Sequence, residues 1–192
     1  MNKALKIFLI VLASILLFIG MVAIYMIAPW DLPITDQDKK LIVQASDLAP
    51  YFDNFTPNKS YESFEKTKYI DFAEELNYEY ESPSDDEPYI SITVSYESKR
   101  SDASIAYTAE WTGMKIGANL ADGEISMKSN DSFYQAGDKS NFSDLTYQGE
   151  ILGHAFIAQK GSTVYSFLIS GFTLEDPSIW RELFDKRIAS LE

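Results

Sequence analysis

A run of 22 residues without a charged side chain, residues 7–28, constrains this chain more than any other feature of its sequence. Ser14 and Tyr25 are its only polar side chains. As a helix, the run would be about 33 Å long, which is enough to cross a hydrocarbon core of about 30 Å. The sequence therefore predicts one transmembrane helix over residues 7–28, with the lipid bilayer as its partner.

A cleaved signal peptide is the alternative interpretation of this run. Signal peptides have an apolar region of about 7–15 residues, followed by a cleavage site with small residues at two positions. This run is longer, Met26-Ile27-Ala28 is a poor match to such a site, and Pro29 follows directly. These features favour an uncleaved anchor.

Charged residues on the two sides of the run predict its orientation. Lys3 and Lys6 precede it, whereas Asp31, Asp36 and Asp38 are the first charged residues after it. Because basic residues next to a membrane helix favour the cytoplasmic side, we expect a single-pass protein with a cytoplasmic N-terminus. The rest of the chain would then be periplasmic or extracellular.

The predicted anchor divides the chain into four parts. We expect a cytoplasmic tail over 1–6, the anchor over 7–28, a short linker over 29–34 and one extracytoplasmic α+β domain over 35–192. The linker contains Pro29 and Pro33 and is too short to let the domain move far from the bilayer.

The domain is strongly acidic. All 29 acidic residues follow the anchor, together with 14 of the 16 basic residues, so the formal net charge of this part is −15. Such a charge repels the phosphate backbone, which excludes nucleic acid as a partner. It leaves open a role in binding a basic protein.

Periodicity predicts an antiparallel sheet with helices. Ile90, Ile92, Val94 and Tyr96 alternate with small polar residues, as in a strand with one buried face and one wet face. Thr35 and Asp38 have the spacing of a capping box, and Asp176-Pro177 is typical of a helix start. We therefore expect an α+β fold in which helices pack on an antiparallel sheet of about six to seven strands, preceded by one transmembrane helix. The expected helices are 35–48, 101–116, ended by Gly117, and a terminal helix after Pro177; the expected strands are 64–70, 76–81, 90–96, 123–129, 143–152, 155–160 and 163–170.

The order of these elements resembles that of PsbP-like α/β sandwich domains over residues 60–192. The resemblance rests on a central helix after the third strand, a terminal helix that carries Trp180, and the Gly-Ser-Thr-Val-Tyr-Ser hairpin at 161–166. The helix at 35–48 and the anchor depart from that pattern. The resemblance implies a non-enzymatic binding or assembly module.

Few residues can carry catalysis or bind a metal. The chain has no cysteine, and His154 is its single histidine, which we expect to be structural. The cluster at 122–124 lacks the spacing of a calcium loop, and no phosphate-binding glycine motif occurs. The acidic clusters at 74–75, 85–87 and 122–124 are typical of solvated turns, with loose binding of a hard cation at 85–87 as the alternative. We therefore predict no cofactor, no metal site and no catalytic residue.

An aromatic patch in an irregular segment is the one candidate binding site. Tyr51, Phe52, Phe55 and Tyr61 form either a surface for a partner or a cap on the core beneath the first helix. The sequence thus favours a membrane-tethered, non-catalytic binding or assembly module with a protein partner in the cell envelope. The alternatives are an acidic inhibitor or immunity-type protein for a basic partner and a carboxylate-based envelope hydrolase.

Overall fold

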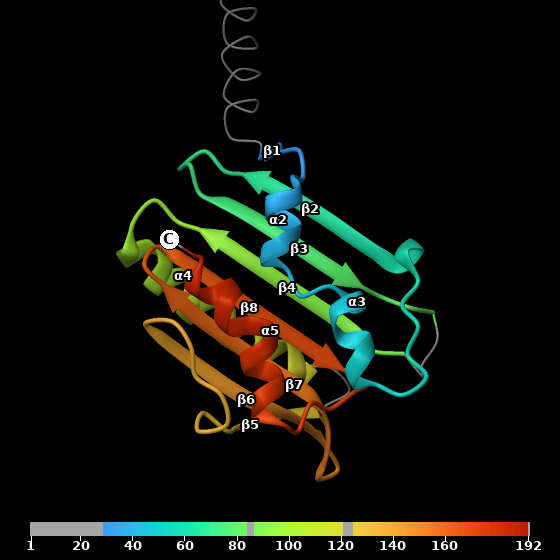
Figure 1. Ribbon diagram of the computed structural model, residues 1–192. Coiled ribbons are helices and arrows are strands. Elements are labelled where there is room, and N and C mark those ends of the chain that lie inside the picture. The colour runs from blue at the N-terminus through green and yellow to red at the C-terminus, as the bar shows by residue number, and fades with distance from the viewer. Residues whose placement is uncertain (1–28, 84–86, 121–124, 192) are drawn as a thin grey trace, which may run out of the picture.

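The computed structural model describes residues 29–83, 87–120 and 125–191. These residues form one open, eight-stranded antiparallel sheet in the order β1-β2-β3-β4-β8-β7-β6-β5, with helices on both of its faces (Figure 1). The strands are β1 Trp30–Asp31, β2 Glu62–Lys68, β3 Glu74–Tyr80, β4 Tyr89–Tyr96, β5 Ile125–Ser129, β6 Lys139–Tyr147, β7 Glu150–Lys160 and β8 Thr163–Ser170. The helices are α2 Asp36–Leu41, α3 Ala45–Leu48, α4 Arg100–Leu120 and α5 Pro177–Ala189, with single 3₁₀ turns at Ala49–Tyr51 and Lys59–Tyr61.

The predicted α+β class with an antiparallel sheet is confirmed. Seven of the strands correspond to predicted ones, and the eighth, β1, forms from residues expected to be linker. Trp30 and Asp31 pair with Lys68 and Thr67 at the edge of the sheet. The first described residues are therefore fixed to the sheet by backbone hydrogen bonds.

Two up-and-down ladders make up the sheet. Strands β1 to β4 form one ladder and β5 to β8 form the other, and both consist of neighbouring antiparallel pairs. Pairing of β4 with β8 over their full length joins the two ladders, with Ile92 opposite Phe167 near the middle.

Alternation along the strands creates two separate cores. On one face, Tyr78, Ile92, Phe167 and Phe156 pack under α2, α3 and α5, where Trp180 is fully buried. On the other face, α4 covers a smaller cluster over β7 and β8, which includes Tyr107 and Trp111 of the helix. The expectation of one wholly wet face is therefore wrong, because α4 covers half of that face.

The predicted helix over 35–48 is broken into α2 and α3. The capping box at its start is present, since Asp38 N donates to Thr35 Oγ1 and Asp38 Oδ2 accepts from Thr35 N. Ile42 is extended rather than helical, so Ile42 and Val43 both reach the core although they are adjacent in sequence. The second helix is then held by the sheet, because Ala45 N donates to the Tyr78 hydroxyl over 2.8 Å.

Two boundaries that were predicted at glycines are wrong. Helix α4 continues through Gly117, because one glycine costs a helix only about 1 kcal/mol relative to alanine. The turn between β6 and β7 lies at Gln148-Gly149, where both φ angles are positive, as two-residue hairpins require. Gly153 lies instead within β7, where a Cβ would come within 2.0 Å of the Ile169 carbonyl oxygen.

The predicted anchor over residues 7–28 lies outside the described residues. Among the helices that are described, none is long and apolar enough to cross a membrane.

Candidate functional site

The predicted aromatic patch lies against the core. Phe55 is buried and makes edge contacts with Tyr80 and Phe172, at ring-centroid distances of 5.7 and 5.6 Å. Phe52 lies 4.3 Å from Phe172, and Tyr61 lies 6.3 Å from Tyr80. Tyr51 is half-buried and packs against the main core, without a ring contact to the other three. The structure thus brings Phe52, Phe55 and Tyr61 together as a cap on the core beyond α3, with Tyr51 on the core beside them, which supports the second of the two interpretations.

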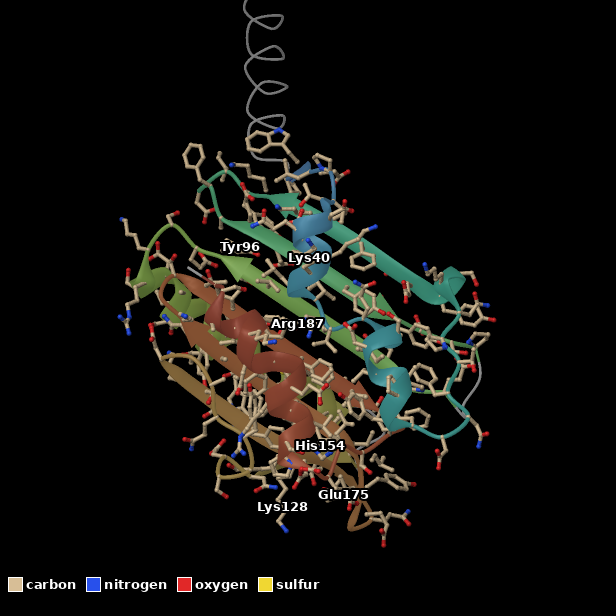
Figure 2. All side chains as sticks on the ribbon, viewed as in Figure 1. Lys40, Tyr96, Lys128, His154, Glu175 and Arg187 are labelled. Atoms are coloured by element: carbon tan, nitrogen blue, oxygen red, sulfur yellow. The ribbon has the colours of Figure 1, made fainter. Side chains whose placement is uncertain are left out.

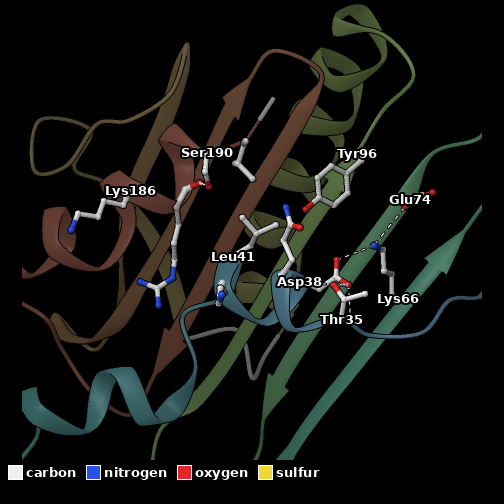
Figure 3. Close-up of a pocket in the computed structure, with 12 residues that line it drawn as sticks. Thr35, Asp38, Leu41, Lys66, Glu74, Tyr96, Lys186 and Ser190 are labelled. Atoms are coloured by element: carbon white, nitrogen blue, oxygen red, sulfur yellow. Dashed lines mark hydrogen bonds and ion pairs between the residues drawn. The ribbon is translucent and has the colours of Figure 1, made fainter.

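A cleft of about 710 Å³ offers a more open candidate site. It lies on the same face of the sheet, between α2, the C-terminal end of α5 and strands β2 to β4 (Figure 3). The side chain of Tyr96 points into it from the end of β4 (Figure 3). Its lining residues are Thr35, Gln37, Asp38, Lys40, Leu41, Lys66, Glu74, Tyr96, Lys186, Arg187, Ser190 and Leu191.

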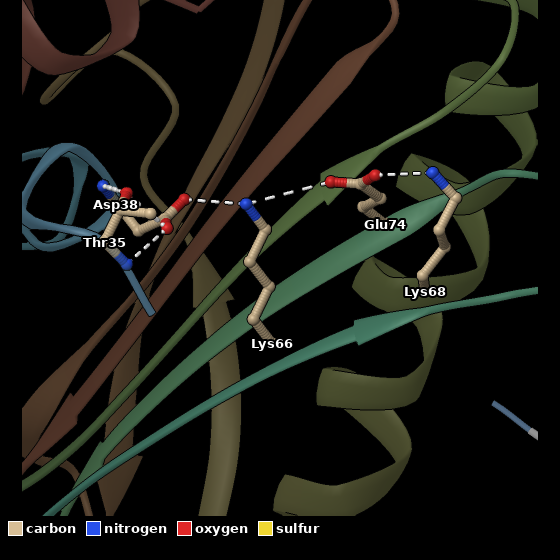
Figure 4. Close-up of polar contacts among 5 residues, drawn as sticks. All are labelled: Thr35, Asp38, Lys66, Lys68 and Glu74. Carbon is tan, nitrogen blue, oxygen red and sulfur yellow. Dashed lines mark hydrogen bonds and ion pairs between the residues drawn. The ribbon is translucent and has the colours of Figure 1, made fainter. Parts of the chain in front are cut away.

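One wall of the cleft is a continuous chain of polar contacts. Asp38 accepts hydrogen bonds from the backbone and hydroxyl of Thr35, and its other oxygen lies 2.9 Å from Lys66 Nζ. Lys66 also lies 3.7 Å from Glu74, which pairs with Lys68 at 2.9 Å (Figure 4). Both carboxylates in the lining are thus neutralised by lysines.

These contacts keep Asp38 charged. Burial would raise the pKa of Asp38, but the hydrogen bonds from Lys66 and Thr35, together with the Lys66 charge, lower it below its ordinary value. Asp38 is therefore an ionised anchor for Lys66 and for the first turn of α2. A carboxyl in this state is unsuited to act as a general acid.

The cleft also contains cations and hydrogen-bond donors from α2, β4 and α5. Arg187 Nη2 lies 2.7 Å from Asp47, an ion pair that ties α5 to α3. Within the described ranges, Lys40 and Lys186 form no ion pair, and the Tyr96 hydroxyl has no hydrogen-bond partner. Arg187 Nε is buried and has no acceptor among the same residues. Figure 2 shows Lys40, Tyr96 and Arg187 on the same side of the domain.

Tyr96 remains a donor at any physiological pH. Burial, followed by the charges of Asp38 and Glu74, raises the pKa of its hydroxyl to about 12. The cleft therefore presents two ammonium groups and a phenol without acceptors. Such a set fits a ligand rich in carboxylate or carbonyl oxygens.

Helix stability accounts for part of this arrangement. Lys40 lies in the last turn of α2, and Lys186 and Arg187 lie in the last turn of α5. Cations at these positions stabilise the negative end of a helix by about 0.3–1 kcal/mol each. That effect does not explain why two helix ends and Tyr96 converge on one hollow.

His154 has the structural environment that the sequence predicted, although it lies within β7 and not between two strands. Its Nδ1 lies 3.0 Å from Asp144, and its Nε2 accepts a hydrogen bond from Leu174 N at 3.0 Å. Burial is the main reason why the pKa of His154 is lowered, so the ring is neutral. Both ring nitrogens are engaged, and no nucleophile is among their partners.

Glu110 has the most perturbed carboxyl outside the cleft. Its side chain is buried between α4 and the sheet, and this burial raises its pKa to about 7. The charge of Glu75 adds to the increase, whereas a short hydrogen bond donated by Ser166 opposes it. Glu110 does not line any of the five most clearly formed cavities among the described residues. In the same part of the chain, no three histidine or carboxylate side chains are grouped to hold a metal.

An uncovered acidic surface lies on the opposite face of the sheet. The register places Glu65, Glu75 and Glu79 on the side of β2 and β3 that faces away from Tyr78. Both lysines of these strands, Lys66 and Lys68, lie on the core side. Helix α4 covers the other half of this face, over β7 and β8. The acidic clusters at 85–86 and 122–124 lie outside the described residues.

Comparison of the chain with known protein families, with curated proteins and with solved structures finds no match in any of the three. The resemblance to PsbP-like domains therefore stays a prediction.

We expect Asp38→Asn to lower the free energy of unfolding by about 2 kcal/mol, because the amide leaves Lys66 without its closest anion. Chemical denaturation measures this change. Asp36→Asn is the matched control, since Asp36 is exposed in the same turn and should change stability by about 0.5 kcal/mol or less. Equal effects of the two substitutions would contradict the structural role of Asp38.

Glu110 should make the protein less stable as pH rises. The pKa of Glu110 in the folded protein is about 7, above the ordinary carboxyl value of 4.5. Between these pH values the folded state holds a proton that the unfolded state releases, and the resulting stabilisation is lost as pH rises through 7. At pH 8, Glu110→Gln should raise the melting temperature above that of the parent protein by about 2–4 °C more than it does at pH 5. This is the change expected for roughly 1 kcal/mol. Thermal melts of the exposed control Glu150→Gln should follow those of the parent protein at both pH values.

Proposed function

We propose that this chain is a membrane-tethered, extracytoplasmic binding or assembly module without a catalytic role. In this proposal, the cleft between α2 and α5 receives an acidic segment of a protein partner in the cell envelope. This proposal rests on one observation: three hydrogen-bond donors without acceptors line the same cleft of a protein that is otherwise acidic. They are Lys40, Lys186 and the Tyr96 hydroxyl. An acidic segment would supply the missing acceptors.

The position of the cleft supports a partner close to the membrane. Helix α2 begins at Asp36, and the run of residues 7–28 that predicts the anchor ends only a few residues earlier. Residues 29–34 are too few to carry the cleft far from the bilayer. A segment that enters the cleft would therefore belong to another protein at the same membrane surface.

The state of the acids argues against the hydrolase alternative. Glycoside hydrolysis requires two carboxyl groups that face one cleft, one of them protonated. In the cleft, Asp38 and Glu74 are each paired with lysine, and the pKa of Asp38 is lowered. Glu110, whose pKa is raised, belongs to α4 and accepts a hydrogen bond from Ser166 of β8 on the opposite face of the sheet.

A second candidate function follows from the uncovered acidic surface. Glu65, Glu75 and Glu79 share one face of β2 and β3 without a lysine or arginine from these strands. A basic partner could bind there by charge complementarity, as an inhibitor or immunity-type function requires. The two candidates place the partner on opposite faces of the same sheet.

Photocrosslinking in the native cells can separate the two candidates. A photoreactive residue at Gln37 should capture a discrete protein if the partner enters the cleft, whereas one at Ser63 should do so if it binds the acidic face. Position 128 is the control, since Lys128 lies at the opposite end of the domain from Lys40 (Figure 2).

Charge reversal then tests the chemistry of the cleft. Lys40→Glu with Lys186→Glu should reduce the Gln37 adduct at least about tenfold, because two favourable charge contacts become repulsive. Lys128→Glu should leave the adduct unchanged. An adduct that survives reversal in the cleft would contradict the proposed recognition of an acidic segment.

The absence of cysteine permits a direct test of the proposed orientation. A membrane-impermeant maleimide, added outside intact cells, should label Lys128→Cys in the full chain. Where an outer membrane is present, spheroplasts are used. Labelling only after the cells are lysed would place the domain in the cytoplasm and contradict the proposal.

A further inference from the structure

The turn between β2 and β3 exposes three large apolar side chains. Tyr69, Ile70 and Phe72 are 37%, 49% and 74% exposed. Only three other large apolar side chains of the described residues are exposed to this degree: Ile105, Ile116 and Ile151. Half of the strongly exposed apolar side chains are thus concentrated within four consecutive residues.

The geometry of this turn makes its sequence unusual. Phe72 N donates to the Tyr69 carbonyl at 3.0 Å, and Tyr69 N donates to the Ala73 carbonyl at 2.8 Å. Phe72 has a φ of 68°, in the left-handed region where a hairpin of this kind favours glycine. Phenylalanine is sterically disfavoured at this position, and its ring is mostly in solvent. Neither turn formation nor core packing therefore accounts for Phe72.

The place where the chain enters the domain points to the surface that this turn meets. Strand β1 runs antiparallel to β2, with Trp30 opposite Lys68. The residue before Trp30 therefore lies level with Tyr69, at the start of the turn. In Figure 1, β1 and the turn between β2 and β3 lie at the same end of the domain. The apolar run of residues 7–28 ends one residue before this point.

The side chains around the turn suit the interface of a bilayer. Trp30 and Tyr69 are of the types enriched where a membrane meets water. Lys68 Nζ lies 5.9 Å from the centre of the Phe72 ring and pairs with Glu74. Its long side chain can keep this charge in water while the apolar part contacts lipid. Asp71, which caps the turn by accepting from Ala73 N, would limit insertion to the headgroup region.

We propose that residues 69–72 dock into the interface of the same bilayer that residues 7–28 cross. The inference rests on the proposed membrane tether and adds a second membrane contact to it. Two contacts, at β1 and at the tip of the β2–β3 hairpin, restrict how the domain can tilt. The cleft between α2 and α5 is thereby held at a defined angle to the membrane surface.

A single labelled cysteine tests the docking in the full chain. The chain, with Phe72→Cys carrying an environment-sensitive fluorophore, is reconstituted into vesicles of phosphatidylcholine and phosphatidylglycerol. Ile151→Cys on β7 is the matched control, because Ile151 is 43% exposed and lies at the end of the sheet that Ser170 and Tyr89 mark, whereas the turn lies beside Tyr96 at the other end. Quenching is measured with iodide in the water and with brominated lipid in the bilayer.

We expect the label at position 72 to be quenched by brominated lipid and protected from iodide several-fold relative to position 151. Equal iodide quenching at both positions, in protein that stays with the vesicles after a high-salt wash, would overturn the docking and leave the tether intact. Protection from iodide without quenching by lipid would overturn it in favour of a contact with protein. Loss of the chain from the vesicles would overturn the tether and the docking together.

Phe72→Gly provides a test that does not depend on unfolding. Glycine suits the left-handed turn, so the melting temperature should be unchanged or higher. In the same variant, a label at Ile70→Cys should lose most of its quenching by brominated lipid. Unchanged quenching would show that Phe72 does not hold the turn in the interface.

Discussion

The pairing of β4 with β8 brings together two halves of the chain that are each a simple antiparallel ladder. Along this seam, Ile90, Ile92 and Val94 lie opposite Ile169, Phe167 and Tyr165, and all six side chains are buried. The seam creates one continuous surface on which α5, from the second half, lies beside α2 and α3, from the first. The ion pair between Asp47 and Arg187 and the cleft exist only because the two ladders share this register.

Local sequence patterns predicted most of the elements. The alternation at 90–96, the capping box at Thr35 and Asp38, and Pro177 after Asp176 each act within a few residues, and all are present in the structure. The errors arose where packing overrode a local signal. Ile42 and Val43 are not helical, because both side chains are buried in the core. Gly153 suggested the end of a strand, but it lies within β7, where the absence of a Cβ allows β8 to approach closely. Trp30 and Asp31 form a strand only because β2 offers an edge.

The cleft could not be predicted in the same way. Its contacts join residues far apart in the chain: Asp38 and Lys66 are 28 positions apart, and Asp47 and Arg187 are 140 apart. Lysines and arginines at helix ends are common, so Lys40 and Lys186 carried no signal before the helices were placed. The aromatic patch, which the sequence did single out, lies against the core through Phe55, Tyr80 and Phe172. The capping box marked Asp38, but only the fold shows that its second oxygen holds Lys66.

One wall of the cleft comes from the first helix of the domain and the other from the last, and this order affects how the protein is made. A chain leaves the ribosome from its N-terminus, so α2 is available long before Lys186 and Arg187 are synthesised. The proposed binding surface is therefore absent from any chain that lacks α5. A partner that requires both walls would engage only chains that contain α5, and a product truncated before α5 could not compete for that partner.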